Sequence, residues 1–423
     1  MGIEEALEKS KMHEYEAVIW REKFSGDPSK WTDACREAAH ARRQLLEKET
    51  GRGLEEAGRC YTNTCNAEKL TTGIEQKIGS AAVPLGVSSP LKVNGEFAKG
   101  EFYIPLATNE AALVAGLNRG RKAVNAAGGV SVRVTRDMMT RAPLVEAPSI
   151  DEASSVADEI RSKGALFDRM KKAAESESKV TRLLEIQPFQ LGRRLHLRFV
   201  FQTGDSMGMN SATKYASAGV KALLDSHRGL KLLSLTGNMC MDKKAGHVNV
   251  LLGRGKSVEV EVLVPSNVLK DVFGVEPEAA ARLCVAKSYE GSALAGTVTG
   301  FNLNAANAVA AVFIATGQDA AQIVESATCF TRAQSMEGGL LFGVTLPCLE
   351  IATVGGGTDY GTAKECLRLL GCDGPGKNPG DNAKKLAEII AAAVLCQELN
   401  LLCALSNGHE LADSHMKLAR GKS

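Results

Sequence analysis

Three ionisable residues lie in otherwise apolar or small-residue surroundings. They are Glu110 in ATNEAALVAG, Lys243 between the apolar runs KLLSLTGNMC and HVNVLL, and Asp319 in IATGQDAAQ. A lysine in such a setting needs a carboxylate partner, because burial disfavours its charge. Each residue alone is more often a cap or turn residue, but together they can form one coupled acid–base site. His415, near the C-terminus, is a candidate general acid for that site.

A second chemical signal is the run Gly204-Asp205-Ser206-Met207-Gly208, which matches the G-x-S-x-G pattern of a serine nucleophile. A predicted strand precedes it and a predicted helix follows. Asp319 and His415 come later, in the Ser–Asp–His order of α/β-hydrolases. However, a strand that leads into a helix N-terminus also suits a bound phosphate. The sequence has no HGGG-type oxyanion loop, which counts against a hydrolase. A hydrolase and an anion site are both open interpretations.

Two further glycine-containing runs are possible phosphate loops. Gly253-Arg-Gly-Lys-Ser257 fails as a Walker loop, since Val250 occupies the position of the first glycine, and it is interpreted as a hairpin turn. In TVGGGT (353–358), three consecutive glycines permit close approach of the backbone to a ligand. A plain flexible turn is the alternative there.

Composition limits the function classes. The chain has 423 residues and a net charge of +2, which gives no electrostatic reason to bind nucleic acid or an anionic membrane. Its eleven cysteines include no C-x-x-C pair, so free thiols are expected and no metal is predicted. The start lacks the pattern of a secretory signal, and the apolar stretches 305–317 and 388–405 are interpreted as core helices. We therefore expect a soluble, cytoplasmic protein.

The pattern of helices and strands predicts a mixed protein. Alternation within about 100 residues indicates a compact α+β or α/β unit between residues 130 and 237. Ser149 followed by Glu152 is a capping-box pattern. The expected helices span 107–129, 149–176, 211–229, 305–327 and 381–408, and the expected strands span 130–143, 195–203 and 231–237, with a hairpin over 248–265.

Several of these runs together resemble the 3-hydroxy-3-methylglutaryl-coenzyme A reductase (HMG-CoA reductase) family, in its class I form. The resemblance covers roughly residues 60–423, and long motifs in series are more specific than any short one. The matching runs are ATNEAALVAGLNRG (107–120), DMMTRAP (137–143), TGDSMGMN (203–210), GNMCMDKKAG (237–246), GRGKSVEVEVLVP (253–265), GQDAAQ (317–322), TVGGGT (353–358) and GHELADSHM (408–416).

The resemblance implies an α+β fold in three parts. An N-terminal helical segment (1–78) precedes a large helix-centred α/β domain (79–143 and 247–423). A ferredoxin-like small NADP(H)-binding domain (144–233) is inserted into it, and a connecting loop (234–246) carries the lysine. Family active sites form between subunits, so a homodimer or a tetramer built as a dimer of dimers is implied.

The resemblance also implies residue roles. Glu110, Lys243 and Asp319 match the catalytic network, and His415 matches the catalytic histidine. The residues implied to hold the substrate or support the lysine are Arg141, Thr236, Asp242, Lys244, Lys287 and Asn307. The residues implied to bind the cofactor are Ser178, Lys179, Asp205, Met207, Gly208, Met209, Asn210, Gly356 and Gly357. The cation of Lys179 at the adenosine 2′-phosphate position favours NADPH over NADH.

The implied reaction converts (S)-HMG-CoA to (R)-mevalonate and coenzyme A in isoprenoid and sterol biosynthesis. Reducing a thioester to an alcohol takes four electrons, hence two NADPH per turnover. Lys243 would stabilise the oxyanion, His415 would protonate the thiolate, and a buried Glu110 would protonate the mevaldehyde carbonyl. The family commonly has Ala where this chain has Ser206. The alternatives are a thioester hydrolase that uses Ser206, and an acyl-coenzyme A sensor, which would need no proton donors.

Overall fold

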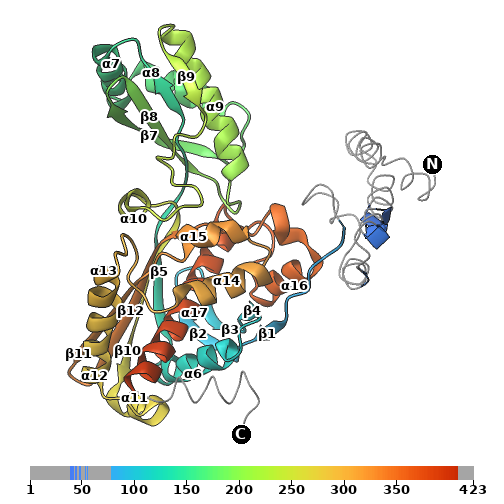
Figure 1. Ribbon diagram of the computed structural model, residues 1–423, viewed down its shortest axis with the longest axis vertical. Coiled ribbons are helices and arrows are strands. Elements are labelled where there is room, and N and C mark those ends of the chain that lie inside the picture. The colour runs from blue at the N-terminus through green and yellow to red at the C-terminus, as the bar shows by residue number, and fades with distance from the viewer. Residues whose placement is uncertain are drawn as a thin grey trace.

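The computed structural model describes residues 78–407, together with positions 39–41, 43–44, 47–48, 53 and 55. The expected N-terminal segment 1–78 therefore lies almost wholly outside the described residues, as does His415. Figure 1 shows two units, and each of them packs around one large apolar cluster. The larger cluster draws on residues 91–132 and 258–403, and the smaller one on residues 139–230.

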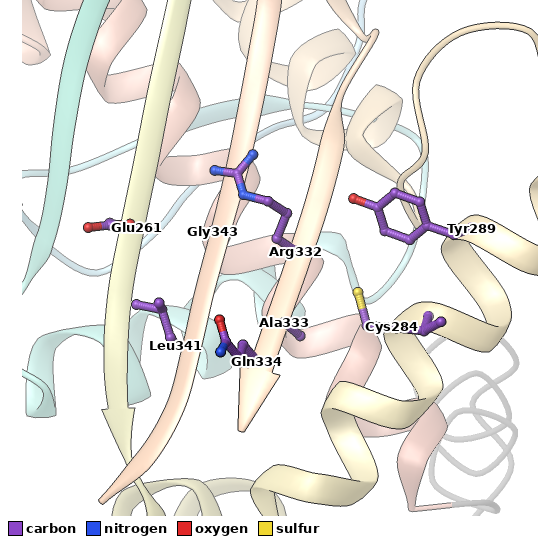
Figure 2. A pocket seen from close by; sticks show the side chains of 9 residues that line it. Glu261, Cys284, Tyr289, Arg332, Ala333, Gln334, Leu341 and Gly343 are labelled. Carbon is purple, nitrogen blue, oxygen red and sulfur yellow. The ribbon is translucent and has the colours of Figure 1, made fainter. Parts of the chain in front are cut away.

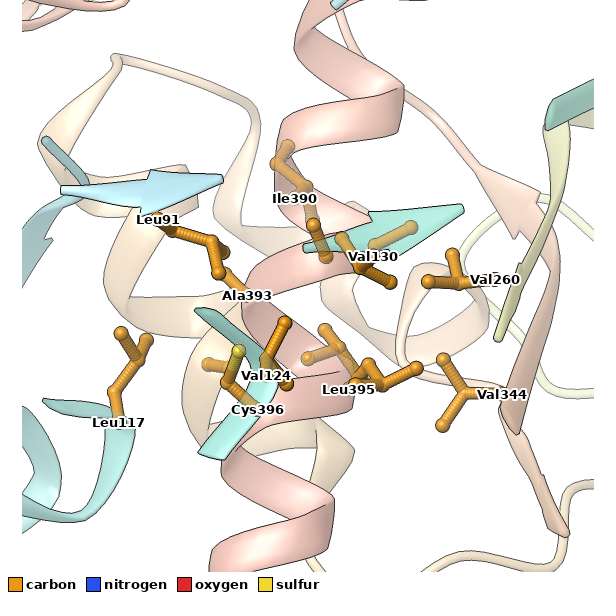
Figure 3. Close-up of a cluster of buried hydrophobic side chains, with 14 of the residues drawn as sticks. Leu91, Leu117, Val124, Val130, Val260, Val344, Ile390, Ala393, Leu395 and Cys396 are labelled. Atoms are coloured by element: carbon orange, nitrogen blue, oxygen red, sulfur yellow. The ribbon is translucent and has the colours of Figure 1, made fainter. Parts of the chain in front are cut away.

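The larger cluster surrounds one long helix, α17 (Asp381–Ser406). Residues 386–399 of this helix are all buried and most of them are apolar, which is typical of a core helix. By length and composition it could cross a membrane, but 78% of its apolar window is buried inside this chain. Figure 3 shows Ile390, Ala393 and Leu395 among side chains from the sheet, including Val130 and Val344. The helix is therefore the core helix of the larger unit, as the sequence predicts.

One mixed sheet runs through both units in the strand order β11-β12-β10-β5-β8-β6-β9. Neighbouring strands on this path pair antiparallel. Strand β5 (Val130–Arg141) connects the units, because residues 131–138 pair with β10 and residues 139–141 pair with β8. The other strands of the larger unit are β1 (Leu85–Val87), β2 (Leu91–Asn94), β3 (Lys99–Phe102), β4 (Pro105–Ala107), β10 (Gly255–Pro265), β11 (Phe330–Met336) and β12 (Gly339–Leu349).

The smaller unit follows the order strand, helices, strand, strand, helix, strand, and its strands lie side by side as β9-β6-β8-β7. Apolar faces of its three helices cover the sheet. Its elements are β6 (Leu144–Glu146), α7 (Ile150–Arg161), α8 (Ala165–Glu175), β7 (Arg182–Leu191), β8 (Arg194–Gln202), α9 (Met209–Ser226) and β9 (Lys231–Ser234).

Shorter helices complete the larger unit. They are α6 (Leu113–Ala126), α10 (His247–Leu252), α11 (Ser266–Phe273), α12 (Pro277–Leu283), the π-helix η1 (Cys284–Gly291), α13 (Ser292–Leu294), α14 (Ala305–Ala315), η2 (Ala320–Gln322), α15 (Ile323–Ser326), η3 (Gly356–Asp359) and α16 (Gly361–Leu369).

Most element predictions are confirmed, including β5, β8, β9, α9 and α17. The Ser149 cap is also confirmed, because its hydroxyl accepts the Glu152 N–H at 3.1 Å. Two predicted helices are wrong in extent. The helix expected over 149–176 breaks into α7 and α8 at Lys163, which has a left-handed φ of 54°. The helix expected from residue 107 begins only at Leu113, after Ala112 at φ 72°.

Two other predictions fail where a glycine changes the chain direction. The hairpin over 248–265 is wrong, because residues 247–252 form the helix α10 and only β10 is a strand. A short apolar run does not distinguish helix from strand by periodicity. The single helix over 305–327 is also wrong. It ends at Ala315, and Gly317 (φ 67°) turns the chain before η2 and α15.

Candidate active site

The loop 234–246 that carries the candidate lysine has an unusual backbone. Asn238, Met241 and Lys243 have φ values of 64°, 48° and 58°, in the left-handed region that residues other than glycine rarely adopt. Such conformations persist only where the surrounding structure enforces them. The position of the Lys243 side chain is therefore set by contacts that hold this loop.

The structure brings Lys243 and Asp319 together. Lys243 Nζ lies 3.1 Å from Asp319 Oδ2, and Asp319 Oδ1 accepts the Ala321 N–H at 3.1 Å, which caps η2. Their side chains are 46% and 38% exposed, so the pair is open to a ligand from solvent. A cation held beside a carboxylate at an open surface can stabilise a developing oxyanion.

Glu110 forms a separate pair. Its Oε1 accepts a hydrogen bond from Asn307 Nδ2 at 3.0 Å. Among the described residues, no hydrogen bond or ion pair joins this pair to Lys243. Glu110 is exposed in this structure, so the expectation that it is buried is wrong.

Arg141 and Asp242, both predicted to serve the substrate, also meet. Arg141 Nη1 lies 3.5 Å from Asp242 Oδ2, and Arg141 Nε donates to Thr213 Oγ1 at 2.9 Å. Burial raises the pKa of the Asp242 carboxyl, but the hydrogen bond from Gln322 and the neighbouring guanidinium groups outweigh burial and hold this pKa below its ordinary value. Asp242 is therefore an anion in the folded chain.

Arg254 joins these elements in a buried ionic network that the sequence interpretation missed. Its side chain is 0% exposed and contacts the carboxylates of Glu325 and Glu350. It also donates to Asp242 Oδ1 at 2.9 Å and contacts Met209 Sδ at 2.8 Å. Burial lowers the pKa of the guanidinium, but its three carboxylate partners raise this pKa above the ordinary value. The only signal was the GRGKS run, which was interpreted as a hairpin turn.

The remaining substrate candidates line exposed surface. Lys244 Nζ donates to the Asp242 carbonyl at 3.1 Å. Thr236 is exposed, and its N–H donates to Ser234 Oγ at 3.1 Å. Lys287 is exposed on the π-helix η1. A π-helical turn often marks a functional position, and this one carries the exposed ammonium-bearing residue Lys287.

The predicted cofactor run 205–210 forms the turn into α9. Gly208 is the N-cap at φ 86°, and no side chain caps the helix. A Cβ on Gly208 would lie 2.4 Å from Thr203 Cγ2, so only glycine fits. The Ser206 hydroxyl donates to the Thr203 carbonyl at 3.0 Å. The free N–H groups of the first turn of α9 suit a phosphate.

Asp205 has a different environment from the one implied by a cofactor contact. Its carboxylate accepts three backbone N–H groups, from Gly376 at 3.1 Å, Gly380 at 2.9 Å and Ala383 at 3.0 Å. Gly380 is the N-cap of α17 and supplies no side-chain cap of its own. Asp205 therefore caps the core helix from the turn that leads into α9.

The glycine run 353–358 lies against that same turn. The Thr353 N–H donates to the Asp205 carbonyl at 2.9 Å. Gly355 and Gly356 have φ values of 79° and 57°, and nothing lies within 4 Å of a Cβ placed on either. Gly357 instead packs on Gly317, where a Cβ on Gly317 would lie 2.2 Å from the Gly357 carbonyl oxygen. The structure thus brings together two of the predicted cofactor runs and the turn that leads to Asp319.

The predicted 2′-phosphate residues precede β7. The Ser178 hydroxyl accepts the Thr181 N–H at 2.8 Å, and Lys179 is exposed. Arg182 adds a second cation, and its guanidinium donates to the Lys179 carbonyl at 3.2 Å. Across residues 78–407 and the other described positions, no group of three or more His, Cys, Asp or Glu side chains could hold a metal ion.

A cavity of ≈ 270 Å³ lies apart from this site, between the outer face of the sheet and η1. Figure 2 shows Arg332 of β11 and Tyr289 of η1 at its edge, with the Cys284 thiol between them. No residue predicted for the site lines it.

The fold and the site are those of an enzyme. An exposed lysine–carboxylate pair is connected through packed loops and a buried arginine to an uncapped helix N-terminus and a glycine loop. A sequence model of the hydroxymethylglutaryl-coenzyme A reductase family matches residues 38–420, so the chain belongs to this family and is an oxidoreductase. The hydrolase interpretation of Ser206 is therefore not supported.

Individual relatives agree with this assignment. The chain is 42% identical to the 3-hydroxy-3-methylglutaryl-coenzyme A reductase of Pyrococcus abyssi over 99% of this chain and 100% of that protein. It is 44% identical to the enzyme of that name from Methanocaldococcus jannaschii, over 90% and 93% respectively. A solved class II HMG-CoA reductase from Streptococcus pneumoniae, described as bound to NADPH, has a TM-score of 0.64 at 20% identity and covers 86% of this chain and 96% of that one. This last similarity concerns the fold alone.

Proposed function

We propose that this chain reduces (S)-HMG-CoA to (R)-mevalonate and coenzyme A, with two NADPH consumed per turnover. The observation that carries the proposal is the exposed Lys243–Asp319 pair at 3.1 Å in a member of this family. A class I assignment and a place in isoprenoid and sterol biosynthesis belong to the same proposal.

The residues present suit NADPH. The uncapped N-terminus of α9 and the open loop at Gly355 and Gly356 can accept its pyrophosphate. Lys179 and Arg182 can hold a 2′-phosphate. When bound, NADPH supplies the hydride. Asp205 and Thr353 hold the two loops together, so their contribution to binding is to position these loops.

The side chains of the site divide the proton and charge work. Lys243 would stabilise the oxyanion formed when hydride adds to the thioester, giving a hemithioacetal. Its collapse releases a coenzyme A thiolate, to which His415 would give a proton. In the second reduction, Glu110 would protonate the carbonyl oxygen of mevaldehyde. Arg141, Lys244 and Lys287 are the cations available for the carboxylate of the substrate.

Larger features of the proposal follow the same reasoning. The strand order β9-β6-β8-β7 supports a ferredoxin-like NADP(H)-binding unit over residues 144–233. A homodimer or tetramer, in which a partner subunit would cover the exposed Glu110, belongs to the same proposal. The burial of α17 supports a soluble chain.

The test is NADPH oxidation by the purified protein on addition of HMG-CoA, with coenzyme A release measured in parallel and NADH as the comparison. We expect about two NADPH consumed per coenzyme A released, with NADH much poorer, and full activity in Ser206→Ala. Release of coenzyme A without nucleotide oxidation, abolished in Ser206→Ala, would refute the proposal.

A further inference from the structure

We propose that residues 319–325 position the catalytic lysine, and that Glu325 is the principal positioning residue of this segment. The inference rests on the proposed catalytic role of Lys243. It concerns the contacts that hold the strained lysine loop in place.

Three side chains of this short helical segment hold two adjacent residues of the lysine loop. Asp319 Oδ2 lies 3.1 Å from the Lys243 ammonium. Gln322 Nε2 donates to Asp242 Oδ1 at 3.0 Å. Glu325 Oε1 accepts the Lys243 backbone N–H at 2.7 Å. The residues are spaced three apart across η2 and α15, so one face of a single segment contacts both the backbone and the ammonium of Lys243.

Glu325 is the fixed end of this arrangement. Gln322 is 0% and Glu325 is 1% exposed, whereas the Asp319 side chain is 38% exposed. Glu325 also contacts the buried guanidinium of Arg254, which in turn donates to Asp242 at 2.9 Å. The lysine loop is thus attached to the core through Glu325 and Arg254, while Asp319 holds the exposed end of the lysine side chain.

The hydrogen bond from the Lys243 N–H to Glu325 helps to hold the backbone of Lys243 in its unusual conformation. The residue has a φ of 58°, and such a left-handed conformation of a non-glycine residue is strained and persists only where surrounding contacts offset its cost. A loop that relaxes from this conformation moves the ammonium relative to Asp319. Displacements of about 1 Å in a reacting group can lower the rate about 100-fold.

Two substitutions of Glu325 distinguish the effect of its side-chain length from the effect of its charge. Glu325→Gln keeps the length of the side chain and an oxygen that accepts the Lys243 N–H. Glu325→Asp keeps the charge but is one methylene shorter, so it cannot reach both Lys243 and Arg254. We expect kcat within about 3-fold of wild type for Glu325→Gln, and about 10- to 100-fold lower for Glu325→Asp. The KM for NADPH should change less than about 2-fold in both.

Glu388 supplies the matched control. It is a buried carboxylate of α17 that also accepts backbone N–H groups, at 3.1, 2.9 and 2.6 Å from residues 96–98, in the larger core. Glu388→Gln and Glu388→Asp test for a general effect of altering a buried carboxylate, and their kcat per folded enzyme should stay near wild type. If Glu325→Asp does not fold, Gln322→Ala replaces it, with an expected kcat loss of several-fold.

The outcomes are distinct. Impaired Glu325→Asp with active Glu325→Gln supports the inference. The reverse pattern, or equal loss in the Glu388 pair, overturns it, because charge or general stability would then explain the effect. Lys243→Ala is measured alongside. An inactive Lys243→Ala with a fully active Glu325→Asp overturns the positioning role alone, whereas a fully active Lys243→Ala overturns both this inference and the proposed role of the lysine.

Discussion

Replacing Asp205 with asparagine tests whether this residue serves the core helix or the cofactor. In the structure Oδ2 accepts the N–H groups of Gly376 and Gly380, and Oδ1 accepts that of Ala383. The substituted side chain could keep an oxygen at the Oδ2 position, but its amide group would then face the Ala383 N–H, donor to donor. The change therefore removes one charge-assisted hydrogen bond, leaves a buried N–H without an acceptor, and weakens two other bonds.

A hydrogen bond to a charged group contributes about 1.5–3 kcal/mol, and a neutral one about 0.5–1.5 kcal/mol. With one such bond lost and two weakened by about 1 kcal/mol each, we expect Asp205→Asn to lower the free energy of unfolding by about 3–5 kcal/mol, measured by urea denaturation with far-UV circular dichroism. The KM for NADPH should also rise, because the turn at 205–210 loses its attachment to α17. Asp151→Asn is the control, since Asp151 lies exposed in the first turn of α7 and should cost less than about 1 kcal/mol. Unchanged stability with a large rise in KM would refute the reasoning and assign the carboxylate to the cofactor.

Three further predictions concern other parts of the frame. Lys179→Ala should raise the KM for NADPH about 10- to 100-fold, as expected for loss of a charge-assisted contact, and leave the KM for NADH unchanged; equal effects on both would remove Lys179 from the 2′-phosphate site. Gly317→Ala places a Cβ 2.2 Å from the Gly357 carbonyl at φ 67°, and should lower stability by more than about 2 kcal/mol together with kcat; a wild-type melting temperature would contradict this. Burial and the neighbouring Glu325 raise the pKa of the Glu350 carboxyl well above its ordinary value, although the adjacent Arg254 guanidinium acts in the opposite direction, so this group's contribution to stability is lost as pH rises above about 4.3. Glu350→Gln removes that loss, so its stability relative to wild type should increase as the pH rises above about 4.3 in urea titrations, and a constant difference would argue against a raised pKa.

Features encoded by local sequence were predictable. The alternation in β5, the capping box at Ser149 and the apolar length of α17 each depend on neighbouring residues, and all three are found in the structure. The run 248–252 shows the limit of such patterns. Its apolar residues suit a strand or a helix equally, and α10 follows from where Gly246 and Gly253 place the chain ends.

The candidate site depended on longer-range information. The apolar surroundings of Lys243 and Asp319 make them candidates for one site, the resemblance to HMG-CoA reductases implies their catalytic roles, and the structure brings them together. Nothing in the local sequence indicated that Asp205 caps α17, because its three donors lie in residues 376–383. Arg254 was missed for the same reason. A buried arginine needs carboxylate partners, and these come from three separate segments of the chain.

This placement of Arg254 also explains why a polar network occupies a position that apolar side chains could fill. Burying charges carries a desolvation cost, and well-packed apolar replacements are often neutral or more stable. Apolar contacts are not directional, however, whereas the network fixes particular atoms. It holds the Lys243 N–H through Glu325 and the Asp242 carboxylate through the guanidinium. The same guanidinium contacts Met209 in the first turn of α9. One buried cation therefore connects the lysine loop with the turn proposed to receive the cofactor, so the relative position of these two segments depends on directed contacts within the core.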